Sequence, residues 1–231
     1  MRNGRGALVC LLAVLMPTLA LAHAIGGKDA AFVAATSGPA ALPFAYLGAK
    51  HMVTGYDHLL FLLGVIFFLH RLRDVALYVT LFSIGHSLTL ATGVAANLNV
   101  SSYLVDAVIG LSVAWKGFDN LGGFRVLFGV QPDNRLVVLC FGLVHGFGLA
   151  TKLQDLHLKP EGLGVNLASF NIGVEMGQLL VLSFLVLGLA ILRGLPLFMA
   201  ASRLSNAALI TAGFIIAGGQ FAGHVLSGSA S

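Results

Sequence analysis

The sequence predicts an all-α protein: a polytopic membrane helix bundle with about six transmembrane helices after an N-terminal signal peptide. Of its 231 residues, 58% are hydrophobic and only 10% are charged, whereas soluble proteins carry about 25% charged residues. The mean hydropathy is +0.93. The 29 glycines and six prolines form no linker or low-complexity tract, so they indicate close helix packing and turns within one membrane domain.

Residues 1–22 have the pattern of a secretory signal peptide. The basic start MRNGRG is followed by the apolar run ALVCLLAVLM and by the small residues ALA, which is the order typical of such signals. Cleavage after Ala22 would leave His23 as the new N-terminus, where its imidazole and the terminal amine could chelate a metal together. Cleavage after Ala24 would remove His23, and the remaining alternative is an uncleaved first helix.

Residues 23–50 are predicted to form a periplasmic N-terminal segment, and residues 51–231 a six-helix transmembrane domain. The N-terminal segment is too short and too rich in glycine, alanine and proline to span a membrane, but we expect a short surface helix over residues 40–50. Six apolar stretches follow, near or above the roughly 17-residue minimum for a span. They cover residues 52–69, 75–96, 103–121, 136–150, 165–192 and 206–226.

Positive charge is distributed unevenly between the two predicted membrane sides. With the N-terminus outside, every arginine after the leader falls on the cytoplasmic side, in agreement with the positive-inside rule. The sequence therefore predicts a bacterial inner-membrane protein with both termini in the periplasm. The cytoplasmic side receives Arg71, Arg73, Lys116, Arg125, Arg135, Arg193 and Arg203, and the outside receives Lys28, Lys50, Lys152 and Lys159.

The net charge and the cysteines exclude two other kinds of function. Arg2 and Arg5 lie in the leader, so the formal net charge of +4 falls to +2 after cleavage and does not indicate a nucleic-acid partner. Cys10 lies in the leader and Cys140 within a predicted helix, so we expect neither a disulfide nor a cysteine ligand framework. The expected partners are instead the lipid bilayer and a metal ion.

The segment HMVTGYDH places His51, Asp57 and His58 at the mouth of the apolar run LLFLLGVIFFL. Residues seven apart in a helix return to within roughly 20° of the same direction, so a continuous helix would put both histidines on one face. Ionisable side chains cost about 2.5 to 3.5 kcal/mol each when they lie deep in a membrane, so they rarely occur there without a function. This segment therefore predicts a functional cluster.

Polar side chains from three later spans are predicted at a similar depth. They come from the middle of the second span and from the outer halves of the fourth and fifth spans. Imidazole and carboxylate ligands suit nickel, zinc, copper, cobalt or iron, and two carboxylates balance a divalent ion. The predicted metal ligands are His51, Asp57, His58, His86, His145 and Glu175.

Further polar residues are predicted to support these ligands. Asn171 and Gln178 lie at spacings of four and three residues from Glu175, on one helical face, and with Ser87 and Thr89 they could orient ligands through hydrogen bonds. Additional candidate ligands are His23, Asp106 and His224. Asp106 is equally explained as a helix-end residue, and His224 as an interfacial one.

Some of these residues also have purely structural explanations. Taken alone, His86 or His145 is explained by an interhelical hydrogen bond, so only their combination with the other ligands indicates a metal. Three GxxxG pairs predict close helix contacts. They are Gly142 with Gly146, Gly173 with Gly177, and Gly219 with Gly223.

These motifs resemble those of the HupE/UreJ family of hydrogenase and urease accessory membrane proteins, in its HupE/UreJ-like branch. The similarity rests on HMVTGYDHLLF, GHSLTL, FGLVHGFGLA and FNIGVEMGQ, in the family's order, and covers residues 49–226. The resemblance implies a nickel permease that serves metalloenzyme maturation machinery. It also implies that His51, Asp57 and His58 engage the metal and that His86, His145 and Glu175 lie along its pathway.

The chain departs from the founding members of that family in one motif. Those members have the form Phe-His-Gly-x-Ala-His-Gly-x-Glu, with two closely spaced histidines and a glutamate. Here FGLVHGFGLA contains the single His145, and the glutamate, Glu175, lies on a later helix.

The sequence leaves three functions open. The first is a permease for a divalent transition metal, with nickel as the first candidate, captured at a site that faces the periplasm. The second is a membrane-embedded zinc hydrolase of a lipid amide or ester, with Glu175 or Asp57 as general base. The third is an assembly subunit that binds metal without moving it. Few ionisable residues lie inward of His86, which favours the enzyme, whereas the family resemblance favours transport.

Overall fold

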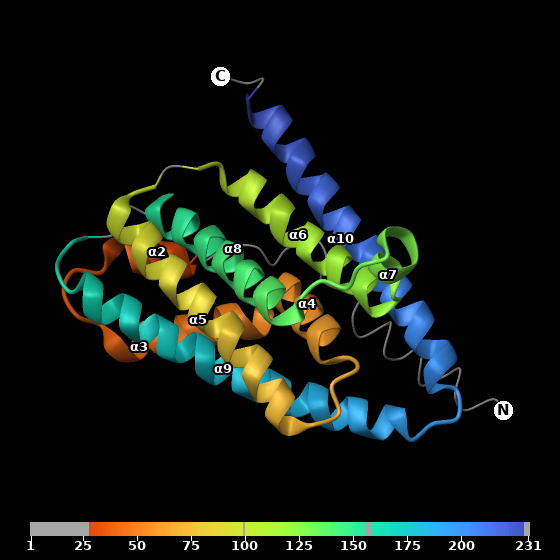
Figure 1. The fold of residues 1–231 in the computed structure, drawn as a ribbon. Helices are drawn as coiled ribbons and strands as arrows, with labels where there is room; N and C mark the ends of the chain where they lie inside the picture. The colour runs from red at the N-terminus through yellow and green to blue at the C-terminus, as the bar shows by residue number, and fades with distance from the viewer. Residues whose placement is uncertain (1–27, 99, 156–158, 229–231) are drawn as a thin grey trace.

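The chain folds into α-helices that are joined by short connections (Figure 1). The computed structural model describes residues 28–98, 100–155 and 159–228, and every regular element within those ranges is a helix. In chain order the helices are α2 (Lys28–Ala35), α3 (Ala41–Thr54), α4 (Tyr56–Ile66), α5 (Leu72–Ala96), α6 (Ser102–Asn120), α7 (Gly123–Phe128), α8 (Asn134–Asp155), α9 (Leu163–Arg193) and α10 (Phe198–Gly228).

Four of these helices, α5, α8, α9 and α10, are long and apolar enough to cross a membrane. They expose many large apolar side chains, among them Phe184 and Leu187 on α9, and such surfaces are typical of contact with lipid. The predicted all-helical membrane bundle is therefore confirmed. The count of six spans stays a prediction, as does the leader over residues 1–22, which lies outside the described residues together with His23.

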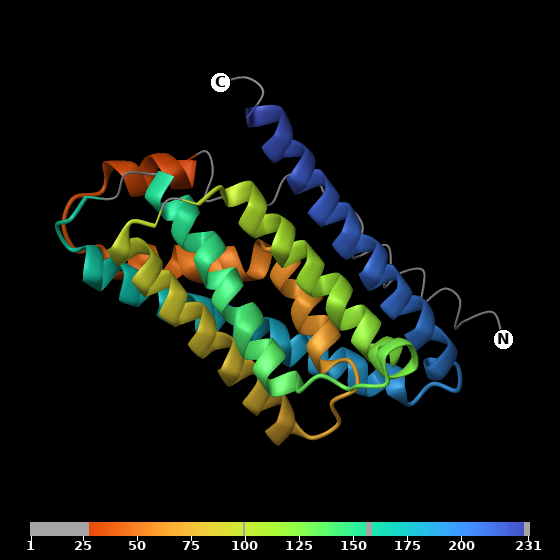
Figure 2. The ribbon, with the colours of Figure 1, turned by 45° about the horizontal axis from the view of Figure 1, so that its top comes forward.

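The long helices pack in pairs: α5 with α8, α6 with α10, and α3 with α9 (Figures 1 and 2). Glycines allow the backbones of each pair to approach closely. A Cβ atom at Gly146 of α8 would collide with the backbone oxygen of His86 on α5, and a Cβ at Gly173 of α9 would collide with that of Ala45 on α3. These pairs therefore have a fixed register, which sets where their polar side chains meet.

Two of the three predicted GxxxG contacts are confirmed by this packing. All four glycines of the two pairs on α8 and α9 lie where a Cβ would collide with the neighbouring helix, whereas no atom of the described residues lies within 4 Å of a Cβ placed on Gly219. Gly219 therefore marks no close helix contact within the described part of the chain.

Helices α3 and α4 form one discontinuous helix that is broken at Gly55, where the chain changes direction (Figure 2). Gly55 has an extended backbone (φ −74°, ψ 95°), and its N–H donates to the backbone oxygen of His51 at 2.8 Å. A Cβ at Gly55 would lie 3.0 Å from Nδ1 of His58 and 3.2 Å from Oδ1 of Asp57. The helix is therefore broken between His51 and His58. The prediction that both histidines lie on one face required a continuous helix, so it does not apply here.

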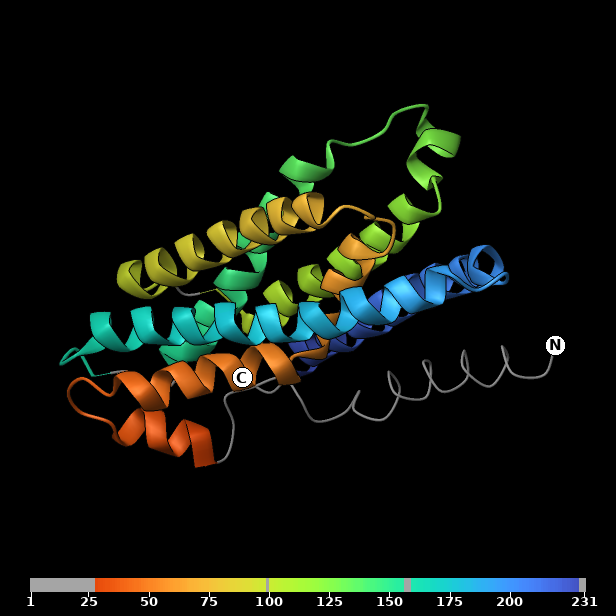
Figure 3. The same cartoon turned by 90° about the horizontal axis from the view of Figure 1, so that it is seen from below.

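A helix, α3, forms over the segment where a short helix was expected, and one of its faces packs against the bundle. Helix α3 lies alongside the first half of α9 (Figure 3) and buries Phe44, Leu47 and Met52. Its opposite face remains exposed, with Leu42 and Tyr46. The helical segment that contains His58 is therefore longer than the predicted first span over residues 52–69, because α3 and α4 together run from Ala41 to Ile66.

The far end of α4 is held by side chains from two other helices. Nη2 of Arg193 on α9 donates to the backbone oxygens of Ile66 (2.9 Å) and Phe67 (2.8 Å), and Nδ2 of Asn120 on α6 donates to that of Gly64 (2.8 Å). The last carbonyls of a helix have no partner within the helix itself. These donors satisfy them and fix α4 within the bundle.

Replacing Gly173 with alanine should destabilise the protein by about 1 to 3 kcal/mol, because the added methyl group would collide with the backbone of α3. Gly219→Ala is the matched control, since its Cβ would meet no described atom within 4 Å. The higher helix propensity of alanine should then leave stability unchanged or raise it by up to about 1 kcal/mol. Thermal unfolding in detergent measures both variants, and equal stability would contradict the packing described.

Candidate metal site

Four histidines from four helices meet inside the bundle, and His58 of α4 lies at their centre. The centre of its ring is 4.9 Å from that of His145 on α8, 5.1 Å from that of His51 on α3 and 5.9 Å from that of His86 on α5. His58, His86 and His145 are at most 3% exposed, and His51 is half-buried. The structure thus brings together all four histidines of the predicted ligand set, and we call them the histidine cluster.

The helix packing explains why residues so distant in sequence meet. Contact between the backbones of α5 and α8 at Gly146 places His86 beside His145. The break at Gly55 ends α3 next to the site and puts Asp57 and His58 in the first turn of α4. Each histidine therefore comes from a position that close packing or a helix end determines.

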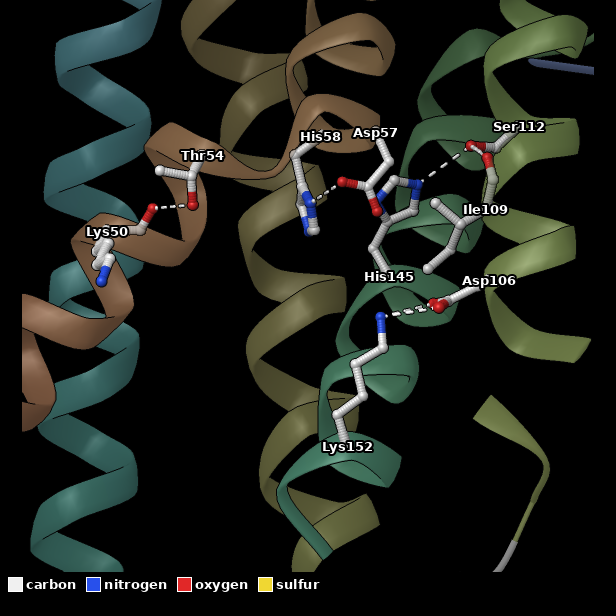
Figure 4. Close-up of polar contacts among 9 residues, drawn as sticks. All are labelled: Lys50, Thr54, Asp57, His58, Asp106, Ile109, Ser112, His145 and Lys152. Carbon is white, nitrogen blue, oxygen red and sulfur yellow. Dashed lines mark hydrogen bonds and ion pairs between the residues drawn. The ribbon is translucent and has the colours of Figure 1, made fainter. Parts of the chain in front are cut away.

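Asp57 fixes the orientation of His58. Nδ1 of His58 lies 3.0 Å from Oδ1 of Asp57 (Figure 4), and since an ionised carboxylate only accepts hydrogen bonds, Nδ1 carries the hydrogen. The lone pair of the ring is then on Nε2, a buried atom that has no hydrogen-bond partner in the described chain. Histidines that bind metals commonly donate the other ring N–H to a carboxylate in this way.

Ser112 of α6 orients His145 in a similar manner. Its hydroxyl donates its only hydrogen to the backbone oxygen of Ile109 at 2.6 Å, so its oxygen accepts from Nε2 of His145 at 3.1 Å (Figure 4). The lone pair of His145 is then on Nδ1, which is buried and lacks a partner among the described residues. Ser112 could not be predicted from the sequence, because no motif distinguishes it from a serine that bonds only to its own helix.

Unpartnered ring nitrogens are the main chemical property of the histidine cluster. A buried polar atom left without a hydrogen bond costs about 1 to 3 kcal/mol, so several in one place indicate a missing partner. Within the described residues, the buried cluster atoms without a partner are Nε2 of His51, Nε2 of His58, Nδ1 and Nε2 of His86, and Nδ1 of His145.

The rings are near each other but are not turned toward one point. No three histidine, cysteine, aspartate or glutamate side chains of the described chain are arranged to hold a metal ion as they stand. Two imidazoles on one ion, at a metal–nitrogen distance of about 2 Å, have ring centres about 5 Å apart, which matches the spacing of His58 from His51 and His145. Those ring pairs meet edge to face, at 77° and 80°. The spacing of these rings therefore suits a shared ion, whereas their described orientation does not yet form a complete set of ligands.

A small cavity of about 10 Å³ lies beside the histidine cluster, which is about the room that one water molecule needs. We call it the histidine cavity. Phe61 and Phe82 pack behind it, with ring centres 5.2 and 5.1 Å from that of His145, and both are fully buried. The lining residues are His51, Asp57, His58, Asp106, Ile109, His145, Gly148, Leu149 and Lys152.

The structure does not bring Glu175 to the histidine cluster, because this side chain is exposed on α9. Gln178 is buried, and its Oε1 accepts a hydrogen bond from Ser83 of α5 at 3.1 Å. Asn171 is half-buried, and its Oδ1 has no partner among the described residues. Glu175 and Gln178 differ by roughly 60° around the helix, and the boundary between the exposed and buried sides of α9 falls between them.

Ser87 and Thr89 of α5 were predicted to orient metal ligands. Among the described residues, neither has a hydrogen bond to a histidine side chain. Thr89 donates to the backbone oxygen of Leu143 at 2.6 Å and so ties α5 to α8. Ser87 is half-buried on α5. Thr89 therefore takes part in helix packing.

The three additional candidates are in different situations. Nδ1 of His224 lies 3.1 Å from Oγ of Ser101, at the contact between α6 and α10, apart from the histidine cluster. Asp106 is buried, lines the histidine cavity and pairs with Lys152. His23 lies outside the described residues. Of the two candidates that lie within the described residues, Asp106 lines the cavity beside the histidine cluster and His224 does not.

The hydrogen bonds described above predict opposite tautomers for two histidines. His58 should carry its hydrogen on Nδ1, and His145 should carry it on Nε2. Nitrogen-15 NMR of histidine-labelled protein without added metal measures both, and Ser112→Ala should change the His145 signal while leaving His58 as it is. A His145 that carries its hydrogen on Nδ1 would contradict the role given to Ser112.

The chain is similar to one known protein family along most of its length. The family model described as HupE / UreJ protein matches residues 27–228, a range that includes every described residue. No curated protein and no solved structure shows a significant match to this chain.

Proposed function

Because the chain belongs to the HupE/UreJ family, we propose that it is a membrane permease for a divalent transition metal. Nickel is the first candidate, with zinc, copper, cobalt and iron as alternatives. The observation that carries the proposal is the set of buried, unpartnered imidazole nitrogens around His58. Neutral imidazoles suit these ions, and the lack of thiolate ligands favours binding that remains exchangeable.

Capture of the ion would start at the partly exposed side of the histidine cavity. His51 is half-buried there, so it is the first imidazole that an incoming hydrated ion would meet. The ring centre of His58 lies 5.1 Å from that of His51, and the ring centre of His145 lies 4.9 Å from that of His58. The lone pairs of His58 and His145 are prepared by Asp57 and Ser112. The ion would exchange its waters for these nitrogens one after another.

Release would require a second conformation of the protein. Phe61 and Phe82 close the side of the histidine cluster opposite Lys152, and apolar side chains offer no ligand to a passing ion. In this transport cycle, the described conformation would be the state that is closed toward the cytoplasm. Movement of these rings would be part of the transport cycle.

We propose that the partly exposed side faces the periplasm of a bacterial inner membrane. Arg71 precedes α5, Arg135 lies in the first turn of α8, and Arg193 ends α9, so these arginines would be cytoplasmic, in keeping with the positive-inside rule. Delivered metal would then be available to the maturation machinery of a hydrogenase or a urease, the role implied by the resemblance to this family of accessory proteins.

A zinc-dependent hydrolase that uses the same histidines is less well supported. Such an enzyme must hold its substrate beside the metal, whereas the histidine cavity of about 10 Å³ has room for about one water molecule. Glu175, one of its two candidate bases, is exposed on α9. A cargo ion fits this space, and a lipid chain does not.

Replacing His58 with alanine should reduce metal uptake by about 100-fold, because the central imidazole of the histidine cluster is lost. Asp57→Asn should reduce it by about tenfold, since the orienting partners of metal-binding histidines contribute about 10- to 100-fold to affinity. Uptake of radioactive nickel into proteoliposomes measures both effects.

Two further variants serve as controls for that assay. His70→Ala removes an exposed histidine in the connection between α4 and α5, so uptake should stay at the wild-type rate. Glu175→Gln should also keep it, because Glu175 does not face the histidine cluster. Wild-type uptake by His58→Ala would refute the proposed ligand set, and loss of uptake by Glu175→Gln alone would move the site to α9.

A further inference from the structure

Lys152 and Asp106 form an ion pair at the partly exposed side of the histidine cavity (Figure 4). Nζ of Lys152 lies 2.8 Å from Oδ2 and 2.9 Å from Oδ1 of Asp106. The Asp106 side chain is 5% exposed and that of Lys152 is 17% exposed. Both residues line the same cavity as three of the four cluster histidines, so an ammonium group already occupies the approach to the site.

The position of Lys152 on α8 explains how it reaches this place. Lys152 follows His145 by seven residues, so both lie on one face of the helix. Gly148 lies between them, and a Cβ there would be 3.5 Å from Oδ1 of Asp106 and 2.9 Å from Cδ1 of Ile109. The missing side chain at Gly148 therefore lets α6 bring Asp106 close to the α8 face that carries a predicted ligand.

The charges around the histidine cavity set a divalent ion against Lys152. Histidines that bind metal are neutral, so Asp57, Asp106 and Lys152 give the lining a net charge of −1. A divalent ion would bring it to +1 if the ammonium group stayed, and to zero if the ammonium group left. Because only the second arrangement balances the buried charges, the ion and the ammonium group compete for the carboxylates.

We propose that Lys152 is a tethered cation that Asp106 holds in the cavity mouth of the metal-free protein and exchanges for the incoming divalent ion. This inference rests on the proposed function. Asp106 passes from the ammonium group to the metal or to one of its bound waters, and Lys152 withdraws toward solvent. The exchange keeps the buried carboxylate neutralised in both states, and it lowers metal affinity enough for the ion to leave again.

Lysine is suited to this exchange for two reasons. Its flexible four-carbon stem carries a compact charge that can extend to the membrane surface, whereas arginine would hold a carboxylate through two parallel hydrogen bonds. Lys152 also lies in the last turn of α8, which ends at Asp155, and the C-terminal end of a helix stabilises a nearby cation. The withdrawn ammonium group therefore has a favourable place to go.

Equilibrium dialysis of the purified full-length protein in detergent against Ni²⁺ tests the exchange. Lys152→Gln should lower the Kd for Ni²⁺ by about tenfold, within the 5- to 150-fold range typical of coupled binding. Lys50→Gln is the matched control: it removes the same charge from an exposed ion pair with Asp29, outside the cavity lining, and should change Kd by less than about twofold. A purely structural role for Lys152 would give weaker binding, so an unchanged or higher Kd in Lys152→Gln would overturn the proposal.

A second comparison covers the case in which Lys152→Gln alone does not fold. Asp106→Asn with Lys152→Gln removes both charges and leaves no carboxylate unpaired. If Lys152 acts by releasing Asp106, adding Lys152→Gln to Asp106→Asn should change Kd by less than about threefold. A gain of about tenfold in that background would mean that Lys152 only repels cations in general, and would refute the exchange.

These outcomes separate the exchange from the proposed function. Absence of Ni²⁺ binding by the wild-type protein would refute the proposed function itself. Wild-type binding that Lys152→Gln does not strengthen would refute the exchange alone.

Discussion

The hydrogen bond between Asp57 and His58 at the helix break is the contact on which the site depends. Three features meet at this bond: a change of chain direction at Gly55, the buried carboxylate of Asp57, and the imidazole of His58. The remaining lone pair of that imidazole has no partner in the described chain. A continuous helix would satisfy its own backbone but would direct these side chains along one face. Broken helices place ligands within membrane bundles because the interruption is protected by neighbouring helices, here α9 along α3 and α6 along α4.

Much of this arrangement could be predicted from the sequence. Composition and the spacing of apolar segments predict a helical membrane bundle, and the motifs around His51, His86 and His145 place polar side chains at a common depth. GxxxG spacing on α8 and α9 predicts the close contacts that bring these helices against α5 and α3. Depth along a helix follows from the sequence alone, which is why the four histidines could be expected to meet.

The rest depends on rotation of helices about their axes, which an apolar sequence does not determine. The spacing on α9 predicts one shared face for Glu175 and Gln178, whereas the boundary between the exposed and buried sides of the helix falls between them. A single glycine is compatible with a continuous helix at a cost of about 1 kcal/mol, so the break at Gly55 could not be predicted. From the sequence, Lys152 was predicted to lie outside the membrane, whereas its side chain pairs with the buried Asp106.

Binding of one divalent ion by several imidazoles of the histidine cluster is the property on which the proposed function depends. X-ray absorption spectroscopy at the nickel edge of the Ni²⁺-loaded protein reports these ligands. We expect nitrogen or oxygen ligands at about 2.0 to 2.1 Å, with multiple scattering from at least three imidazoles and no sulfur. A coordination shell of oxygen alone, without imidazole scattering, would contradict it.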